Sequence, residues 1–168
     1  TNKRDDKYGG SLENRARLLT QITQKIKASC ANNFSVSVKL NSADFQRGGF
    51  EPSDAQAVIT LLSDLNIDFV ELSGGSYEAP AMQGKTADER TLAREAYFLE
   101  FAKTISEQSS IPIMTTGGIS RLSVANNVID SGVALAGIAT ALAYKPDLVS
   151  IWQKQPEFIP AAPNVQIK

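Results

Sequence analysis

The sequence predicts an α/β fold of the parallel (β/α)8 TIM-barrel type, of which this chain supplies four strand–helix units preceded by one helix. Two observations carry this prediction. Apolar residues follow helix and strand periodicity in regular alternation, which implies parallel strands joined by right-handed crossovers. In addition, two strands are polar on one face. An open doubly wound sheet is the alternative, but helices cover both of its faces, so its central strands should be apolar on both.

The expected elements follow in order. A helix is expected over residues 12–29, with Ser11 as its N-cap. Strands are expected at 35–40, 68–73, 111–116 and near 134–138, with helices after Pro52, around 98–105, over 122–130 and after Pro146, and with a long charged connection through 84–90. The barrel domain should span residues 1–155, and an irregular, proline-containing tail should span 156–168.

Two of the strands are polar on one face. In SVSVKL, apolar residues alternate with Ser37 and Lys39, and in DFVELS they alternate with Glu71 and Ser73. A barrel lumen accepts such side chains near the carboxyl ends of its strands. Because a complete barrel needs eight strand–helix units and this chain holds four, the sequence predicts half a barrel.

Composition and charge exclude several classes of function. Seventeen basic and eighteen acidic residues leave a net charge of −1, so no nucleic-acid or membrane partner is expected. The single cysteine cannot form an internal disulfide, and no apolar run is long enough for a signal peptide or a membrane span, which favours a cytoplasmic protein. The chain has no histidine, so the commonest general base is missing, and no metal site is predicted.

Lys39 is the first candidate functional residue. It lies near the carboxyl end of its strand on the expected lumen face, where barrel enzymes place functional groups, and its charge could hold an anion. It could equally pair with Glu71 on the neighbouring strand, since buried charges are paired. The sequence alone leaves both interpretations open.

Two turns are the second candidate. Gly117 and Gly118 follow a strand and precede a helix, so their backbone N–H groups could bind a phosphate, although a tight turn explains a glycine pair as well. Ala139 and Thr140 follow the next strand in a similar turn. Barrels most often bind phosphate at the turns after their seventh and eighth strands, so the two turns together are a stronger indication than either alone.

Six segments stand out as a set: KRDDKYGGSLENRARLL (3–19), VKLNSADFQRGGF (38–50), VELSGGSYEAP (70–80), REAYFLEFA (94–102), IMTTGGIS (113–120) and GIATALAYKPDL (137–148). In order and spacing they resemble the old yellow enzyme family of NADH:flavin oxidoreductases. The resemblance implies an FMN-binding (β/α)8 barrel that takes hydride from NADH or NADPH and passes it to a small molecule, an activated alkene or a similar acceptor. It also implies that this chain is the C-terminal half, with strands 5–8.

The resemblance assigns roles to the candidates. Lys39 would lie against the flavin pyrimidine and stabilise negative charge at N1 and O2 of reduced FMN. The N–H groups at Gly117 and Gly118 would bind the FMN phosphate, as would those at Ala139 and Thr140. Two departures concern this phosphate: Thr140 stands where family members usually carry an arginine, and the preceding SGVALAG lacks the usual aspartate.

No catalytic residue is predicted in this chain. In the family, the substrate-orienting histidine pair (or His and Asn) and the proton-donating tyrosine would lie N-terminal to it. The chain is therefore expected to be a fragment of an FMN-dependent oxidoreductase that is inactive alone and that self-associates or pairs with the missing half. The alternative is a non-catalytic half-barrel that binds a phosphate-bearing ligand or a protein partner.

Overall fold

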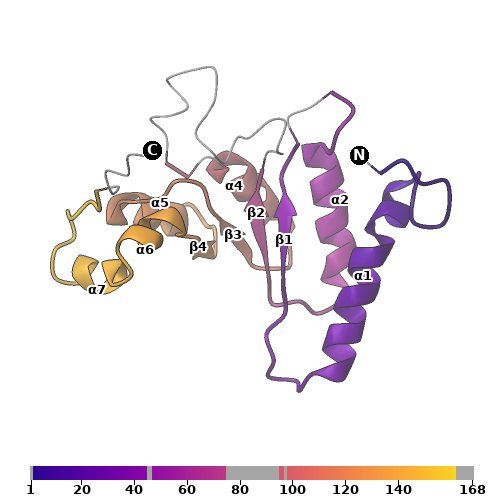
Figure 1. Cartoon of the computed structure of the whole chain (residues 1–168), viewed down its shortest axis with the longest axis horizontal. Helices are drawn as coiled ribbons and strands as arrows, with labels where there is room; N and C mark the ends of the chain where they lie inside the picture. Colours follow the sequence, from indigo (N-terminus) through magenta and orange to yellow (C-terminus); the bar gives the residue numbers. More distant parts are fainter. Residues whose placement is uncertain (1, 45–46, 75–94, 97, 162–168) are drawn as a thin grey trace, which may run out of the picture.

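The structure is a computed structural model that describes residues 2–44, 47–74, 95–96 and 98–161. The strands of this part are β1 Ser37–Asn41, β2 Phe69–Ser73, β3 Ile113–Thr115 and β4 Leu135–Ala136. Its helices are α1 Leu12–Ser29, α2 Pro52–Ser63, α4 Leu99–Gln108, α5 Leu122–Asp130, α6 Thr140–Tyr144 and α7 Leu148–Trp152 (Figure 1). The expected alternation of strands and helices is present, and the expected connection through 84–90 lies outside the described residues.

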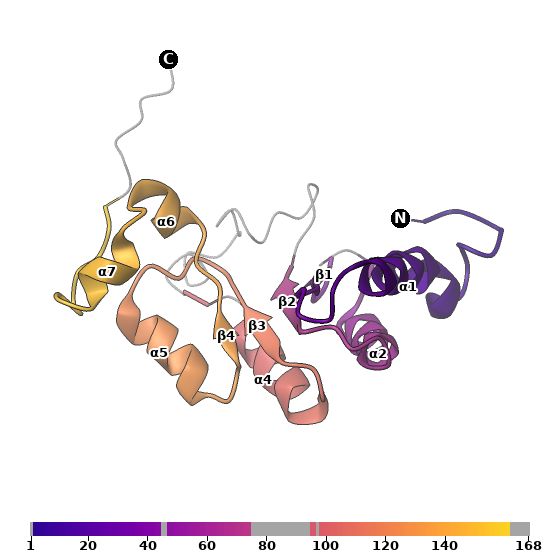
Figure 2. The same cartoon turned by 90° about the horizontal axis from the view of Figure 1, so that it is seen from below.

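The four strands form one parallel sheet in the order β1-β2-β3-β4. Helices α2, α4 and α5 lie on the same side of this sheet (Figure 2). In a doubly wound sheet the strand order reverses at a switch point and helices cover both faces. Consecutive strand order with one helical layer is instead the arrangement of a barrel wall. The parallel α/β fold is confirmed, and the assignment to strands 5–8 stays a prediction.

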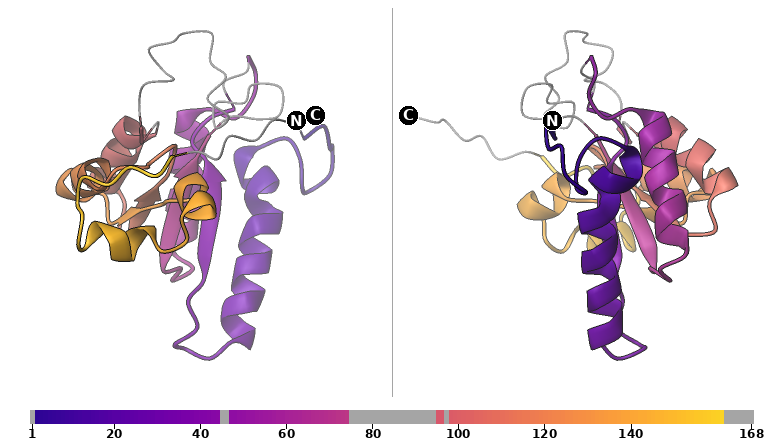
Figure 3. Two further views of the ribbon diagram at one scale, coloured as in Figure 1. Left: turned by 60° about the vertical axis from the view of Figure 1, so that its left-hand side comes forward. Right: turned by 90° about the vertical axis from the view of Figure 1, so that its right-hand side faces the viewer.

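Local sequence signals explain where the helices begin. The Ser11 hydroxyl accepts a backbone N–H of the first turn of α1 at 3.3 Å, as expected for an N-cap. Helix α2 begins at Pro52, a position at which the missing N–H of proline costs no helical hydrogen bond. Glu51 and Asp54 form a capping box at the same helix start. Helix α1 packs beside α2 (Figure 3), and the Arg15 and Asp54 side chains lie 3.5 Å apart between them.

The main core lies between the sheet and its helices. Val38, Val70 and Ile113 stand side by side on β1, β2 and β3 and are 7%, 0% and 1% exposed. Leu62 of α2 and Ile105 of α4 are buried in the same cluster. Fully burying a side chain of this size contributes about 1.5–3 kcal/mol, so this apolar layer holds the helices against one face of the sheet.

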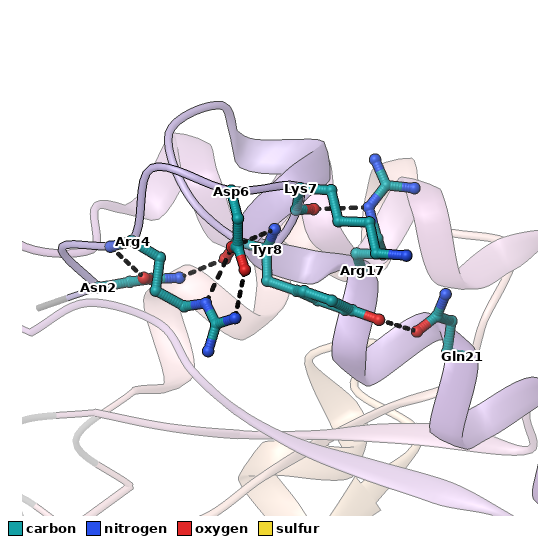
Figure 4. A network of polar contacts seen from close by, with 7 residues as sticks. All are labelled: Asn2, Arg4, Asp6, Lys7, Tyr8, Arg17 and Gln21. Carbon is teal, nitrogen blue, oxygen red and sulfur yellow. Dashed lines mark hydrogen bonds and ion pairs between the residues drawn. The ribbon is translucent and has the colours of Figure 1, made fainter.

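The residues before α1 fold back onto that helix (Figure 4). Arg4 forms an ion pair with Asp6, whose carboxylate also accepts the Tyr8 N–H at 3.0 Å. The hydrogen bond from Arg4 and the Tyr8 N–H together lower the pKa of Asp6 to about 2. The Tyr8 hydroxyl bonds to Gln21 at 3.1 Å, and Arg17 Nε donates to a carbonyl of the loop at 2.7 Å. These contacts give several residues of KRDDKYGGSLENRARLL a structural purpose.

Three details differ from what the sequence leads one to expect. Ile22 and Ile26 of α1 are 48% and 38% exposed, because nothing in the described part of the chain covers them. Helix α6 was not expected, since five residues are too few to show helical periodicity. Strand β4 holds only two residues, although the Ala134 and Gly137 N–H groups also donate to β3 carbonyls at 3.0 and 2.7 Å.

The chain after β4 forms a smaller cluster. Ala141, Leu148 and Trp152 are buried together, and Trp152 Nε1 donates to the Phe158 carbonyl at 2.9 Å. Residues 156–161 form neither helix nor strand, and the division into a barrel domain and a tail stays a prediction. None of the helices in the described residues is long and apolar enough to span a membrane.

Candidate functional site

A row of four side chains crosses the sheet on the face opposite the helices. The register aligns Lys39 with Glu71, Glu71 with Met114 and Met114 with Leu135, one residue from each strand. Successive side chains of a strand point to opposite faces, and the neighbours Val38, Val70, Leu72, Ile113 and Thr115 are buried. The Lys39 side chain is 54% exposed and Leu135 is 40% exposed. Both therefore lie on an open face among the described residues, whereas Ser73, which the sequence also predicts on the polar face, is only 4% exposed.

Lys39 and Glu71 form an ion pair across β1 and β2. This is one of the two interpretations that the sequence left open. The ion pair leaves Lys39 able to bind a further group, because an ammonium has three N–H donors and the Lys39 side chain remains half exposed. An ion pair with this much solvent access contributes about 0–1 kcal/mol to stability, so stability alone is a weak reason for a lysine here.

The two predicted turns lie side by side at the carboxyl ends of β3 and β4. The Gly137 N–H donates to the Thr115 carbonyl at 2.7 Å, and the Thr116 hydroxyl donates to the Gly137 carbonyl at 3.1 Å. A Cβ on Gly137 would meet the end of the Met114 side chain at 2.5 Å and the Thr115 carbonyl oxygen at 3.2 Å, so a larger residue would require Met114 and the turn to shift. These contacts fix the turn after β4 against the turn after β3.

Several backbone N–H groups of these turns have no protein partner among the residues that the structure describes. Gly117 and Gly118 have φ of +122° and +70°, a conformation that favours glycine. In the described part of the chain, the N–H groups of Gly117, Gly118, Ala139 and Thr140 donate no hydrogen bond. Gly118, Ala139 and Thr140 are exposed. Unpaired N–H groups clustered at strand ends provide the donors that an anion such as a phosphate needs.

Glu95 binds the two residues that lead into α5, Ser120 and Arg121. The Glu95 carboxylate accepts the N–H groups of Ser120 and Arg121 at 3.0 and 3.3 Å, the Ser120 hydroxyl at 2.8 Å and Arg121 Nε at 2.9 Å. Burial alone would raise the pKa of Glu95, but these hydrogen bonds and the Arg121 charge outweigh it and lower that pKa. The Ser120 and Arg121 N–H groups are therefore not available to an anion.

Sequence reasoning missed Glu95. No local signal pointed to it: Glu95 accepts the N–H groups of Ser120 and Arg121, which precede α5, and does not replace the N-cap acceptor that α5 lacks. Which carboxylate accepts these N–H groups depends on tertiary packing, because Glu95 is 25 residues away from Ser120 in sequence.

The described residues hold no cluster of three or more His, Cys, Asp and Glu side chains that could bind a metal ion. The site consists of backbone donors, a half-exposed lysine and an open sheet face. Such groups can bind and orient an anionic ligand, but they include no histidine to serve as a general acid or base.

Comparison with known proteins places this arrangement in a family. The family model for NADH:flavin oxidoreductases and NADH oxidases matches residues 1–157. The chain belongs to this family. The resemblance inferred from the six sequence segments is thereby confirmed.

Individual proteins are similar to this chain in sequence or in fold. The NADH-dependent flavin oxidoreductase iliE of Neonectria sp. is 32% identical over 175 residues, which cover 99% of this chain and 23% of that protein. A 2-naphthoyl-CoA reductase structure superposes with a TM-score of 0.81 at 25% identity and covers 95% of this chain and 24% of that one. The old yellow enzyme homologue from Zymomonas mobilis shares the fold, with a TM-score of 0.68 at 24% identity, over 96% and 43% of the two chains. The chain spans less than half the length of each of these proteins.

Proposed function

We propose that these 168 residues form the C-terminal half of the barrel of an FMN-dependent oxidoreductase, with strands 5–8 and a domain spanning residues 1–155. One observation carries the proposal: at the carboxyl end of a parallel sheet, two adjacent strand-to-helix turns present N–H groups that have no partner in the described part of the chain. Family membership supplies the chemical context. In such a fold, ligands bind at this end of the strands.

The residues present fit FMN. The N–H groups of Gly117 and Gly118, with those of Ala139 and Thr140, are the proposed donors to its phosphate. Thr140 supplies no positive charge, so this contact lacks the charge-assisted hydrogen bond that an arginine would give, which is about 1.5–3 kcal/mol. We therefore propose that, within this half of the barrel, only backbone N–H groups bind the phosphate.

Lys39 is proposed to contact the pyrimidine side of the flavin ring. Its ammonium lies on the open face of β1 and is held by Glu71, so its position is defined before any ligand arrives. A cation at that side of the ring stabilises negative charge on it. FMN, when bound, supplies the hydride acceptor and donor of the reaction.

The proposed reductant is NADH or NADPH, and the proposed acceptor is a small molecule with an activated double bond. The iliE protein is named as NADH-dependent, and the 2-naphthoyl-CoA reductase structure contains 2-naphthoyl-CoA. Groups that orient and protonate such an acceptor are proposed to lie outside these 168 residues, because no histidine occurs within them.

The test uses the full-length protein that contains this chain. We expect the purified protein to be yellow, to release FMN on denaturation as identified by mass spectrometry, and to lose its visible absorbance when NADH or NADPH is added without oxygen. A folded protein that neither retains nor rebinds FMN would contradict the proposal. That result would favour the non-catalytic alternative, in which Lys39 serves only its ion pair with Glu71 and the turns bind another phosphate-bearing ligand or nothing.

A further inference from the structure

We propose that Glu95 is a positioning residue for the flavin phosphate: it fixes the turn after β3 so that the N–H groups of Gly117 and Gly118 face the ligand. This inference rests on the proposed function. It concerns a residue that would not touch FMN and that acts through Ser120 and Arg121.

Glu95, Ser120 and Arg121 form a hydrogen-bonded cluster, called the clasp below. One carboxylate oxygen accepts the two backbone N–H groups of Ser120 and Arg121, and the other accepts the Ser120 hydroxyl and Arg121 Nε. The Glu95 side chain is only 15% exposed. Four donors converging on one nearly buried carboxylate restrain Ser120 and Arg121, which begin two residues after Gly118.

The residue after Glu95 strengthens the same connection. The Ala96 N–H donates to the Gly117 carbonyl at 2.7 Å, and Ala96 is 6% exposed with φ of +56°. A non-glycine residue in the left-handed region costs about 1–2 kcal/mol and persists only where its surroundings hold it there. Residues 95–96 therefore fix the turn from both sides, at the Gly117 carbonyl and at Ser120.

The clasp also decides which donors remain for a phosphate. Glu95 uses the Ser120 and Arg121 N–H groups, whereas the Gly117 and Gly118 N–H groups of the turn before them have no partner among the described residues. A carboxylate near a phosphate would repel it, but Arg121 forms an ion pair with Glu95 at 2.9 Å and offsets this charge. Removing the carboxylate would leave the Ser120 and Arg121 N–H groups without this acceptor, so the turn before α5 could move.

The experiment compares the full-length protein with Glu95→Gln and Glu100→Gln. Glutamine keeps the shape of glutamate but has one acceptor oxygen, so it cannot accept all four donors. Glu100 is a matched control, because it loses the same charge on the neighbouring α4 and its side chain is 88% exposed. For each protein, FMN and riboflavin affinities are measured by fluorescence quenching, and backbone amide exchange is measured without flavin.

In Glu95→Gln we expect faster exchange at residues 117–121 and FMN affinity lowered about tenfold, the equivalent of one lost charge-assisted contact. Riboflavin, which has no phosphate, should bind within about twofold of the unmodified protein, and Glu100→Gln should match that protein in every measurement. If amide exchange in Glu95→Gln is unchanged, or if its affinities for FMN and riboflavin fall equally, the positioning role is wrong. In that case FMN binding by the unmodified protein would still support the proposed function. A folded unmodified protein that binds no FMN would overturn both.

Discussion

The Lys39 ammonium and the Glu71 carboxylate pair across two neighbouring parallel strands, on the sheet face opposite helices α2, α4 and α5 (Figure 2). Glu71 fixes where the positive charge stands and at the same time reduces its effect on anything that binds the open face. A ligand at Lys39 therefore experiences two opposed charges, one from each strand. This arrangement allows the electronic effect of the pair to be tested from both sides.

If the flavin ring lies against Lys39, Lys39→Ala and Glu71→Gln should shift the flavin midpoint potential in opposite directions. Loss of the cation destabilises the reduced ring and lowers the potential, whereas loss of the carboxylate raises it. For a two-electron couple, about 30 mV corresponds to 1.4 kcal/mol, and shifts of this order are expected because Lys39 is half exposed. Spectroelectrochemistry on the FMN-bound full-length protein measures them. Shifts of the same sign, or none, would place the ring elsewhere.

Gly9 should not tolerate a side chain. A Cβ at this position would overlap the Arg4 carbonyl group, where the loop before α1 folds back. We expect Gly9→Ala to lower the free energy of unfolding by about 1–3 kcal/mol, as forced overpacking does. Gly10→Asn is the matched control, because nothing lies within 4 Å of a Cβ there and asparagine tolerates its φ of +79°. Urea denaturation of both variants compares them, and equal stabilities would mean that the loop moves aside without cost.

Acid should weaken the clasp at the start of α5. The pKa of Glu95 is lower in the folded chain than its ordinary value of 4.5, so its contribution to stability is present above pH 4.5 and is lost as the pH falls through the folded value. Glu95→Gln cannot ionise and should show a smaller loss of stability over that acidic range. Denaturation midpoints measured from neutral pH downward report this difference. If the two proteins lose stability in parallel as the pH falls, Glu95 has the same pKa in the folded and the unfolded chain.

The 168-residue chain on its own should associate. Strands β1 and β4 form the two ends of the described sheet, and Leu18 and Ile22 of α1 are 58% and 48% exposed. Unpaired strand edges and exposed apolar side chains both favour association. Sedimentation at increasing concentration should show dimers or larger species. A monomer that stays monomeric at high concentration would indicate a self-sufficient sheet rather than half of a barrel wall.

The sequence was sufficient to predict those helices and strands that are long enough to show a periodic pattern of apolar residues. Alternation in the strand containing Lys39 predicted both the buried Val38 layer and the open polar face, because period-two patterning depends only on strand geometry. The boundaries of α1 and α5 also agree with the predicted ranges. Short elements were harder: α6 has five residues and β4 has two, so neither extends over enough chain to show a period.

The site was only partly predictable, and for a different reason. Gly117 and Gly118 could be selected because positive φ favours glycine in a strand-to-helix turn. The pairing of Lys39 with Glu71 could be named but not decided, since register is set by the packing of whole strands. Glu95 could not be placed at all, because its contact with Ser120 spans 25 residues and is made by tertiary packing.

The turn at Thr140 allows the most direct test of the claim that this half of the barrel binds the flavin phosphate. Thr140 is exposed, its N–H donates no hydrogen bond in the described part of the chain, and it carries no charge. In the full-length protein, Thr140→Arg should tighten FMN binding about five- to a hundredfold, the range expected for one charge-assisted contact, and should leave riboflavin binding nearly unchanged. Fluorescence titration of both flavins measures the difference. Equal gains for FMN and riboflavin, or no gain for either, would contradict a phosphate site at these turns.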